Sequence, residues 1–226
     1  MSSKPYGSVF AELQATCPQI WKAYTNHDFV EGLKDGSLPH DAFLHYLRQD
    51  YVFLMHFSRA WALAVVKSET HSEMMTAVSI VNALISEEIQ LHVGVCKEMG
   101  ISEAELFATR ETPANLAYTR FVLEVGYSGD LLDLLSALLP CVMGYGEIGT
   151  RLKAEMSAPT YADWINTYAG EEYQGVCQAV AELVDSAVER RIGKEFALSP
   201  RWARLCETFK TATELEVGFW QMGMTP

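Results

Sequence analysis

A cysteine directly behind a proline is the first feature of this sequence that could do chemistry. The segment Ala137-Leu-Leu-Pro-Cys-Val-Met-Gly-Tyr-Gly-Glu-Ile-Gly149 has the apolar character of a buried helix, and within it Cys141 follows Pro140. Because proline cannot donate a backbone hydrogen bond, it should kink this helix or begin a new one. Cys141 would then lie near a helix start, where unpaired N–H groups favour a thiolate. Tyr145, four residues later, should share its helix face and point into the same space.

Two carboxylic acids on apolar helix faces could provide acid and base catalysis for this thiol. Asp50 lies in an apolar stripe of a helix expected over residues 39–68. Glu216 lies one turn before Trp220 in a last helix expected from Ser199 to Met222. Buried acids are uncommon unless they are paired or functional, so they favour a reactive thiol over a buried apolar one. The remaining cysteines lack such neighbours and are expected to be structural: Cys17, Cys96, Cys177 and Cys206.

Three tyrosines lie at or beside expected helix breaks, where side chains can line the mouth of a pocket. They could be ordinary rim or core aromatics, or they could hold a flat heterocycle. The three are Tyr118, Tyr168 and Tyr173.

The elements that must position these residues are helices. Apolar residues recur at helical spacing almost everywhere, whereas strict alternation over the length of a strand is hard to find. The 226 residues suffice for one sizeable core and are somewhat few for two, so we expect a single all-α domain over residues 1–226. Ser199-Pro200 and Thr112-Pro113 each have the form of an N-cap followed by proline at the first helical position. Helix-breaking residues divide the chain into about eight or more helices, with breaks at Asp35-Gly-Ser-Leu-Pro39, Met99-Gly100, Arg110-Glu-Thr-Pro113, Tyr127-Ser-Gly-Asp130, Ser157-Ala-Pro159, Ala169-Gly170 and Leu198-Ser-Pro200.

Two further patterns could indicate cofactor chemistry. Gly144-Tyr-Gly146-Glu-Ile-Gly149 has the form G-x-G-x-x-G, but a dinucleotide fold needs a strand before it, and a Leu-rich helix precedes it here. We interpret these glycines as small residues that leave a cavity or allow close helix packing. Glu88 and His92 could converge on iron inside a bundle, but they are four residues apart instead of three and have no second copy. A helix-face hydrogen bond or a substrate contact is the alternative for this pair, and we expect no metal site.

Composition and charge exclude several partners. The formal net charge of -12, with no Lys/Arg cluster, would repel a nucleic-acid backbone. The longest apolar run, Leu134 to Tyr145, is too short to span a bilayer and contains Pro140, so we expect a buried helix and no membrane association. The N-terminus lacks the apolar core of a signal peptide, and five scattered cysteines indicate free thiols in a reducing cytoplasm.

Four fragments together resemble the TenA family, the thiaminase II or aminopyrimidine aminohydrolase proteins. The resemblance covers nearly the whole chain, in order and at matching separations. It implies the helical fold shared with haem oxygenase, usually assembled as a homotetramer. The fragments are Leu47-Arg-Gln-Asp50-Tyr, then Ala137-Leu-Leu-Pro-Cys141 with Tyr145-Gly-Glu147-Ile-Gly, then Trp164-Ile-Asn-Thr-Tyr168, and finally Glu216-Val-Gly-Phe-Trp220.

The resemblance also implies roles for individual residues. Cys141 matches the family's nucleophile and places the chain in the Cys-containing branch. Glu216 matches the acid/base at the reacting end, and Tyr168, a pocket tyrosine, is grouped with these catalytic residues. Asp50 matches the carboxylate that binds the amino edge of the pyrimidine.

Three further positions are implied to bind substrate. Tyr118 and Tyr145 match pocket tyrosines of the family. Phe53 occupies a position that is often a stacking tyrosine, so the ring is kept here while the hydroxyl and any hydrogen bond it would make are lost.

Residue chemistry and resemblance agree on a mechanism without metal or organic cofactor. The thiolate of Cys141 adds to the electron-poor pyrimidine ring beside the carbon that bears the aminomethyl arm, while Glu216 protonates a ring nitrogen or the leaving amine. After the amine leaves, water adds to the exocyclic carbon and the thiolate departs, which releases hydroxymethylpyrimidine. The substrate, a small molecule, could be thiamine, the aminopyrimidine or its N-formyl form.

Two functions of other classes remain as alternatives. An oxidase on the same fold, like the pyrroloquinoline quinone synthases, would need a basic or metal-binding pocket. A non-catalytic binding or regulatory protein would bind the pyrimidine without turning it over, and its Cys141 would resist alkylation.

Overall fold

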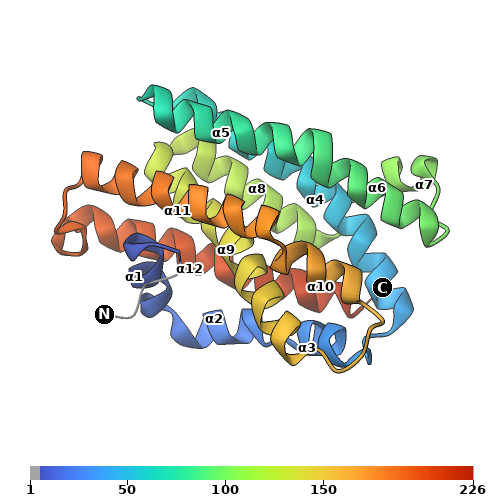
Figure 1. The fold of residues 1–226 in the computed structure, drawn as a ribbon. Helices are drawn as coiled ribbons and strands as arrows, with labels where there is room; N and C mark the ends of the chain where they lie inside the picture. The colour runs from blue at the N-terminus through green and yellow to red at the C-terminus, as the bar shows by residue number, and fades with distance from the viewer. Residues whose placement is uncertain (1–5, 226) are drawn as a thin grey trace.

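The computed structural model describes residues 6–225, so most of the N-terminal segment that lacks a signal-peptide pattern, Met1 to Pro5, lies outside the described residues. The described chain contains no strand, which confirms the all-α prediction. Figure 1 shows the helices, most of them long, packed side by side. They are α1 (Ser8–Thr16), α2 (Pro18–Thr25), α3 (Asp28–Asp35), α4 (His40–Lys67), α5 (His71–Ala83), the π-helical η1 (Leu84–Glu88), α6 (Ile89–Glu98), α7 (Glu103–Phe107), α8 (Pro113–Ser128), α9 (Leu131–Glu155), α10 (Ala162–Ala169), α11 (Glu171–Arg191), the 3-10 helix η2 (Phe196–Leu198) and α12 (Pro200–Gly223).

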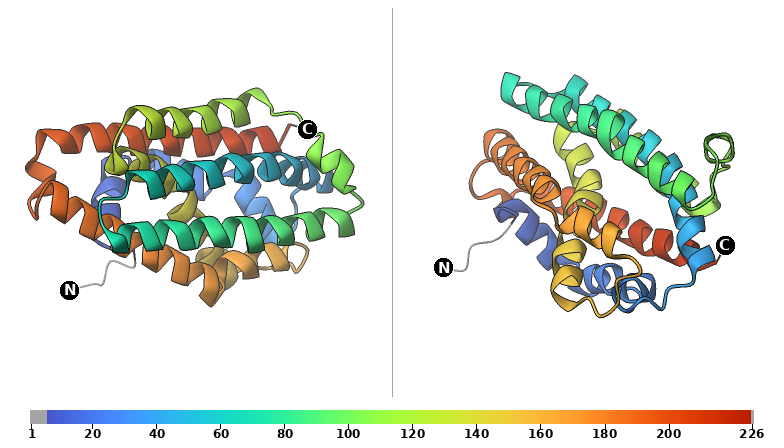
Figure 2. Two further views of the ribbon diagram at one scale, coloured as in Figure 1. Left: turned by 90° about the horizontal axis from the view of Figure 1, so that it is seen from above. Right: turned by 45° about the vertical axis from the view of Figure 1, so that its right-hand side comes forward.

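Helix α9 is the centre of this arrangement. It packs against α8, α10, α11 and α12, which approach it from different sides (Figure 2). By length and composition alone α9 could cross a membrane, but 89% of its apolar window is buried inside the protein. A helix that is apolar all round and covered on every side is a core helix, and this confirms the expected buried helix.

The two helices that carry the candidate acids have the predicted extents. Helix α4 spans His40–Lys67, and α12 begins at Pro200, directly after Ser199. The Ser199 side chain accepts a hydrogen bond from the Arg201 N–H, and Thr112 caps α8 in the same way through Asn115. In both cases proline occupies the first helical position, which confirms these two predicted caps.

Pro140 does not begin a new helix, so that alternative of the prediction is wrong. Helix α9 runs continuously from Leu131 to Glu155 with Pro140 inside it, so Cys141 lies in the middle of a helix and not at its start. Side chains from neighbouring helices supply hydrogen bonds to this stretch of backbone: Tyr24 donates to the Pro140 carbonyl at 3.3 Å, and Tyr173 donates to the Val142 carbonyl at 3.2 Å. These two bonds tie α9 to α2 and α11 on either side of Pro140.

The glycines of the G-x-G-x-x-G pattern allow close helix packing, as interpreted from the sequence. A Cβ placed on Gly144 would overlap the ring of Tyr24, and one placed on Gly146 would come within 2.7 Å of the Cys177 Sγ. At Gly149 the obstacle is backbone, because the added Cβ would lie 2.7 Å from the Ala169 nitrogen. Helix α10 can lie this close to α9 only because residue 149 has no side chain.

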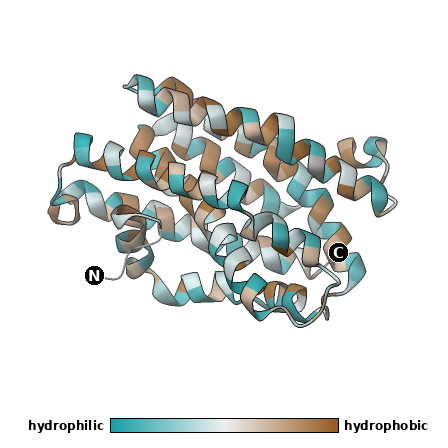
Figure 3. Cartoon of the chain, viewed as in Figure 1, coloured by the Kyte–Doolittle hydropathy of each residue, from teal (hydrophilic) through white to brown (hydrophobic). Residues whose placement is uncertain are grey.

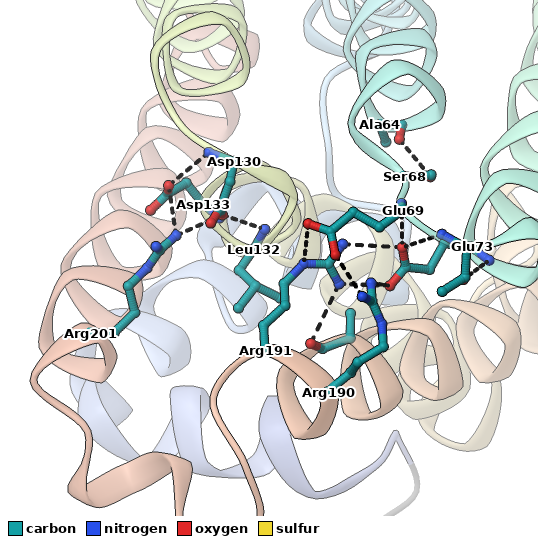
Figure 4. A network of polar contacts seen from close by, with 12 residues as sticks. Ala64, Ser68, Glu69, Glu73, Asp130, Leu132, Asp133, Arg190, Arg191 and Arg201 are labelled. Carbon is teal, nitrogen blue, oxygen red and sulfur yellow. Dashed lines mark hydrogen bonds and ion pairs between the residues drawn. The ribbon is translucent and has the colours of Figure 1, made fainter.

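A buried carboxylate ties α5 to α11. Glu73 is 4% exposed, forms a capping box with Thr70, and accepts hydrogen bonds from Arg190 and Arg191 (Figure 4). Burial opposes the charge of Glu73, but the hydrogen bonds from Arg191 and Arg190 outweigh it and lower its pKa to about 2. Glu69, which is 59% exposed at its side chain, pairs with the same two arginines from the rim.

The rod formed by α5, η1 and α6 exposes apolar side chains. Figure 3 shows that hydrophobic and hydrophilic residues alternate along these helices. Among the side chains that the structure describes, the large apolar ones exposed on the rod are Met74, Met75, Val78, Ile85 and Val95. Exposed apolar side chains can mark a protein interface.

We predict that Gly149→Ala lowers the free energy of unfolding by about 1–3 kcal/mol, because neighbouring backbone cannot give way to the new methyl group. Chemical denaturation measures the change. The control is Gly175→Ala in α11, where an added Cβ has no neighbour within 4 Å; it should gain about 0.5–1 kcal/mol from helix propensity. Equal effects of the two substitutions would contradict the close-packing explanation.

We predict that Glu73→Gln lowers stability at neutral pH by about 2 kcal/mol, because two arginines lose their buried carboxylate. Since the folded pKa of Glu73 is lowered, its contribution is present above pH 4.5 and is lost as the pH falls towards 2. Thermal unfolding from pH 7 to pH 2 should therefore show a smaller acid loss in the variant. Glu69→Gln, at the exposed rim of the same network, should change stability by less than about 0.5 kcal/mol.

Candidate active site

Three helices bring two of the predicted catalytic residues and the predicted substrate-binding carboxylate into one buried cluster. Asp50 comes from α4, Cys141 from α9 and Glu216 from α12, and their exposed fractions are 3%, 8% and 1%. The negative charges of Glu216 and Asp50 both raise the pKa of Cys141, and Glu216 raises that of Asp50. Residues that are far apart in the sequence thus share one electrostatic environment, as the predicted site requires.

The surroundings of Glu216 give its carboxyl a pKa at which it can both accept and donate a proton. Burial raises its pKa from 4.5 to about 8, and a hydrogen bond from Tyr118 partly offsets this rise. Tyr118 Oη donates to Glu216 Oε1 at 2.7 Å. A carboxyl group with a pKa near working pH is suited to general acid and base catalysis.

The expectation that Cys141 is a thiolate in the free protein is wrong. Its mid-helix position offers no free N–H groups, and burial raises the pKa of the thiol well above 9. The charges of Glu216, Glu88 and Asp50 raise it further. Cys141 is therefore a neutral thiol until a nearby base takes its proton.

Asp50 is also shifted towards its protonated form. Burial raises its pKa well above 3.8, the charges of Glu88 and Glu216 add to the rise, and a hydrogen bond from Tyr46 lowers it. A protonated carboxyl offers both a donor and an acceptor to a polar ligand. Asp50 thus provides polar contacts within an otherwise aromatic surrounding.

Aromatic rings enclose the cluster on two sides. On one side Phe53 packs against Tyr118 at 5.0 Å between ring centroids and against Phe219 at 5.4 Å. On the other side the ring centroid of Tyr168 lies 4.9 Å from the ring centroids of both Tyr145 and Tyr173. The structure thus places the candidate tyrosines in two groups, Tyr118 with Phe53, and Tyr145 and Tyr173 with Tyr168.

Sequence reasoning missed two tyrosines of this lining. Tyr46 precedes Asp50 by one helical turn and bonds to it, and Tyr24 reaches the cluster from α2. The spacing of Tyr46 and Asp50 on one helix face was a usable signal. Tyr24 gives no such signal, because its position depends on how α2 packs against α9.

The Glu88 and His92 pair is also part of the site, although the two do not bond to each other. Glu88 ends the π-helical η1, and His92 lies in α6. Burial raises the pKa of Glu88 to about 7. His92 Nε2 lies 2.5 Å from the Leu47 carbonyl, and Nδ1 lies 3.5 Å from Asp50 Oδ2. Within residues 6–225, no group of three or more acidic, histidine or cysteine side chains could hold a metal ion.

A cavity of about 400 Å³ opens beside the cluster, between η1, α9 and the start of α11. We call it the vestibule. Glu88 and Val142 line it, so it meets the cluster at these two residues, while the acids and the thiol themselves lie deeper. Its lining contains no Lys, Arg or His, and it carries four glutamates: Glu87, Glu88, Glu171 and Glu172. Another cavity, of about 420 Å³ between α4, the α5–α6 rod and α7, is lined by none of the candidate residues.

Known proteins resemble this chain in sequence over nearly its whole length. A protein from Halalkalibacterium halodurans named aminopyrimidine aminohydrolase is 36% identical over 218 residues, which cover 95% of this chain and 95% of that protein. A protein of the same name from Helicobacter pylori is 30% identical over 213 residues, which cover 93% of this chain and 95% of that protein.

Solved structures match the fold. A Silicibacter protein described as a TenA family transcription regulator has a TM-score of 0.98 at 69% identity, covering 99% of this chain and 100% of that one. A TenA homologue from Pyrococcus horikoshii has a TM-score of 0.85 at 28% identity, covering 96% and 98%. A Shewanella denitrificans domain with a heme oxygenase-like fold has a TM-score of 0.71 at 12% identity, which confirms the predicted fold. Residues 15–225 match the family model TENA/THI-4/PQQC, and the chain belongs to this family.

Proposed function

We propose that this protein is an aminopyrimidine aminohydrolase, or thiaminase II, that acts in thiamine salvage. It converts 4-amino-5-aminomethyl-2-methylpyrimidine, and also thiamine, to 4-amino-5-hydroxymethyl-2-methylpyrimidine. The names of the relatives from Halalkalibacterium halodurans and Helicobacter pylori support this activity. The observation that carries it is the burial of the Cys141 thiol in one cluster with Glu216 and Asp50.

The pyrimidine binds among the aromatic rings. Phe53 and Tyr145 pack on its faces, while Asp50 receives its amino edge through the acceptor oxygen of the neutral carboxyl. A neutral, buried site of this kind favours a flat heterocycle over a strongly charged one.

Catalysis begins with a proton transfer from the thiol. The ionised Glu216 takes the proton of Cys141, and the sulfur adds to the ring carbon next to the one that bears the aminomethyl arm, forming a C–S bond. The electron pair displaced from the ring moves onto a ring nitrogen. With the aminopyrimidine, Glu216 returns its proton to the leaving nitrogen, the exocyclic C–N bond breaks, and the amine departs. With thiamine the leaving nitrogen is quaternary, so Glu216 protonates the ring nitrogen instead, and the C–N bond breaks to release neutral thiazole.

Water completes the cycle at the exocyclic carbon. Its oxygen forms the new C–O bond, its proton passes to Glu216, and expulsion of the sulfur restores the aromatic ring. The released sulfur takes this proton from Glu216, which restores the Cys141 thiol and the ionised carboxylate. Tyr118 holds the Glu216 carboxyl in position throughout, and Tyr168 lies at the side of the cluster nearest the vestibule. The acidic vestibule offers a protonated amine a favourable exit, because its lining carries glutamates and no basic side chain.

The same proposal covers the setting of the enzyme. Residues 1–226 act as one TenA-like domain that needs no metal or organic cofactor. The five free cysteines support a reducing cytoplasm. The exposed apolar side chains of the α5–η1–α6 rod support assembly into a homotetramer, with neither nucleic acid nor membrane as a partner.

We predict that Cys141→Ser reduces release of the hydroxymethylpyrimidine at least about a thousandfold, because serine is a much weaker nucleophile in the same position. Steady-state kinetics with the aminopyrimidine, and separately with thiamine, measure the change by chromatography of the product. The control is Cys206→Ser, which removes a half-buried thiol outside the cluster and should retain full turnover.

The outcomes of this experiment separate the alternatives. Wild-type protein that binds the pyrimidine without turnover would make the chain a binding or regulatory protein. Equal turnover by wild type and Cys141→Ser would show that another group is the nucleophile.

We predict that Tyr118→Phe moves the acid limb of the kcat/KM profile to higher pH. The limb follows ionisation of Glu216, whose pKa is about 8 and is lowered by the hydrogen bond from Tyr118. Removing this bond disfavours the charged carboxylate, so the pKa rises, by about one unit. Tyr161→Phe removes a buried hydroxyl that bonds to the Leu38 carbonyl, away from the cluster, and should leave the limb unchanged. An unchanged limb in Tyr118→Phe would mean that Glu216 is not the base.

A further inference from the structure

We propose that His92 is a positioning residue that fixes which oxygen of the Asp50 carboxyl faces the pyrimidine. The inference rests on the proposed function and adds a residue to that site. Two contacts carry it: His92 Nε2 bonds to the Leu47 carbonyl at 2.5 Å, and His92 Nδ1 faces Asp50 Oδ2 at 3.5 Å. Leu47 and Asp50 are less than one turn apart on α4, so one imidazole contacts both.

The contact with Leu47 fixes the tautomer of His92. A backbone carbonyl can only accept, so Nε2 must carry the proton that it donates to Leu47. In the neutral imidazole, Nδ1 then has a free lone pair and can only accept. The face that His92 presents to Asp50 is therefore an acceptor.

The surroundings keep this imidazole neutral and this carboxyl protonated. Burial lowers the pKa of His92, which the Leu47 bond partly offsets, while burial and the charges of Glu88 and Glu216 raise the pKa of Asp50. The proton therefore resides on Asp50, opposite the Nδ1 lone pair. The other titratable groups coupled to Asp50 are neutral at pH 7: Tyr46, Tyr145, Tyr168, Cys96 and Cys141.

Pairing with His92 determines which oxygen of the Asp50 carboxyl is the donor and which is the acceptor. A protonated carboxyl has one donor oxygen and one acceptor oxygen, and only the acceptor can receive the amino group of the pyrimidine. With its O–H directed from Oδ2 to His92 Nδ1, Asp50 offers Oδ1 as the acceptor. The separation of 3.5 Å is long for a hydrogen bond, as is common in catalytic pairs before substrate binds.

Two substitutions separate the two nitrogens of His92. In His92→Gln the side-chain amide can reach the place of Nε2 and keep the bond to Leu47, but nothing replaces Nδ1. In His92→Asn the shorter amide oxygen takes the place of Nδ1 and can accept from Asp50, while the bond to Leu47 is lost. The two variants are thus matched controls for each other.

The direct measurement is the pKa of the Asp50 carboxyl in the free protein, followed by 13C NMR and assigned with Asp50→Asn. We expect His92→Gln to lower this pKa by about one unit, since the protonated form loses its acceptor. His92→Asn should restore it towards the wild-type value. The melting temperature should fall more in His92→Asn, because that variant loses the bond to the Leu47 carbonyl.

The inference is overturned if the Asp50 titration is the same in wild type and His92→Gln, or if both variants shift it equally, because His92 would then only join α6 to α4. Failure of the proposed function looks different. In that case the wild type does not release hydroxymethylpyrimidine, although the NMR titration still reports on the pair.

Discussion

The burial of α9 on every side is the constraint on which the rest of the structure depends. Because α8, α10, α11 and α12 all pack against it, α9 carries small residues where another element comes close, as at Gly149 against the backbone of α10. The same enclosure supplies the side-chain hydrogen bonds from Tyr24 and Tyr173 that accompany the helix across Pro140. It also removes Cys141 from water. The packing of helices around α9 therefore affects both the stability of the core and the chemistry of the Cys141 thiol.

Desolvation without a neighbouring cation governs the candidate site. Asp50, Glu88 and Glu216 are driven towards their protonated forms, and Cys141 stays a thiol. Elsewhere in the chain the same residue type behaves in the opposite way: Glu73 is just as buried, yet its two arginines hold it ionised. A buried glutamate beside arginine side chains stays ionised and stabilises the fold. A buried glutamate without such a neighbour has a raised pKa and is suited to acid and base chemistry.

The helical architecture could be predicted from the sequence because its signals are local. Apolar periodicity defined α4, and serine or threonine before proline located the starts of α12 and α8. Pro140 misled for the same reason: its preference is local, whereas the continuous α9 is packed against helices from other parts of the chain. The ionisation of Cys141 depends on burial by four helices, and the contact of His92 with Asp50 depends on how α6 packs against α4. Neither the ionisation of Cys141 nor the contact of His92 with Asp50 can be predicted from the neighbouring sequence. The acids on apolar helix faces, in contrast, correctly indicated a buried cluster.

The π-helical η1 has a consequence for the register of the α5–η1–α6 rod. A π turn uses about one residue more than an α turn, and each residue rotates a helix by about 100°. The side chains of α6 are therefore rotated about the helix axis by roughly the angle of one residue. The reference is the position they would have if α5 continued as a regular α-helix. This rotation directs His92 towards α4, while Ile85 remains on the outer surface. A loss of one residue between Leu84 and Glu88 would restore a regular helix and carry the imidazole away from its carboxyl partner, so chain length at this point is as much a part of the site as any side chain.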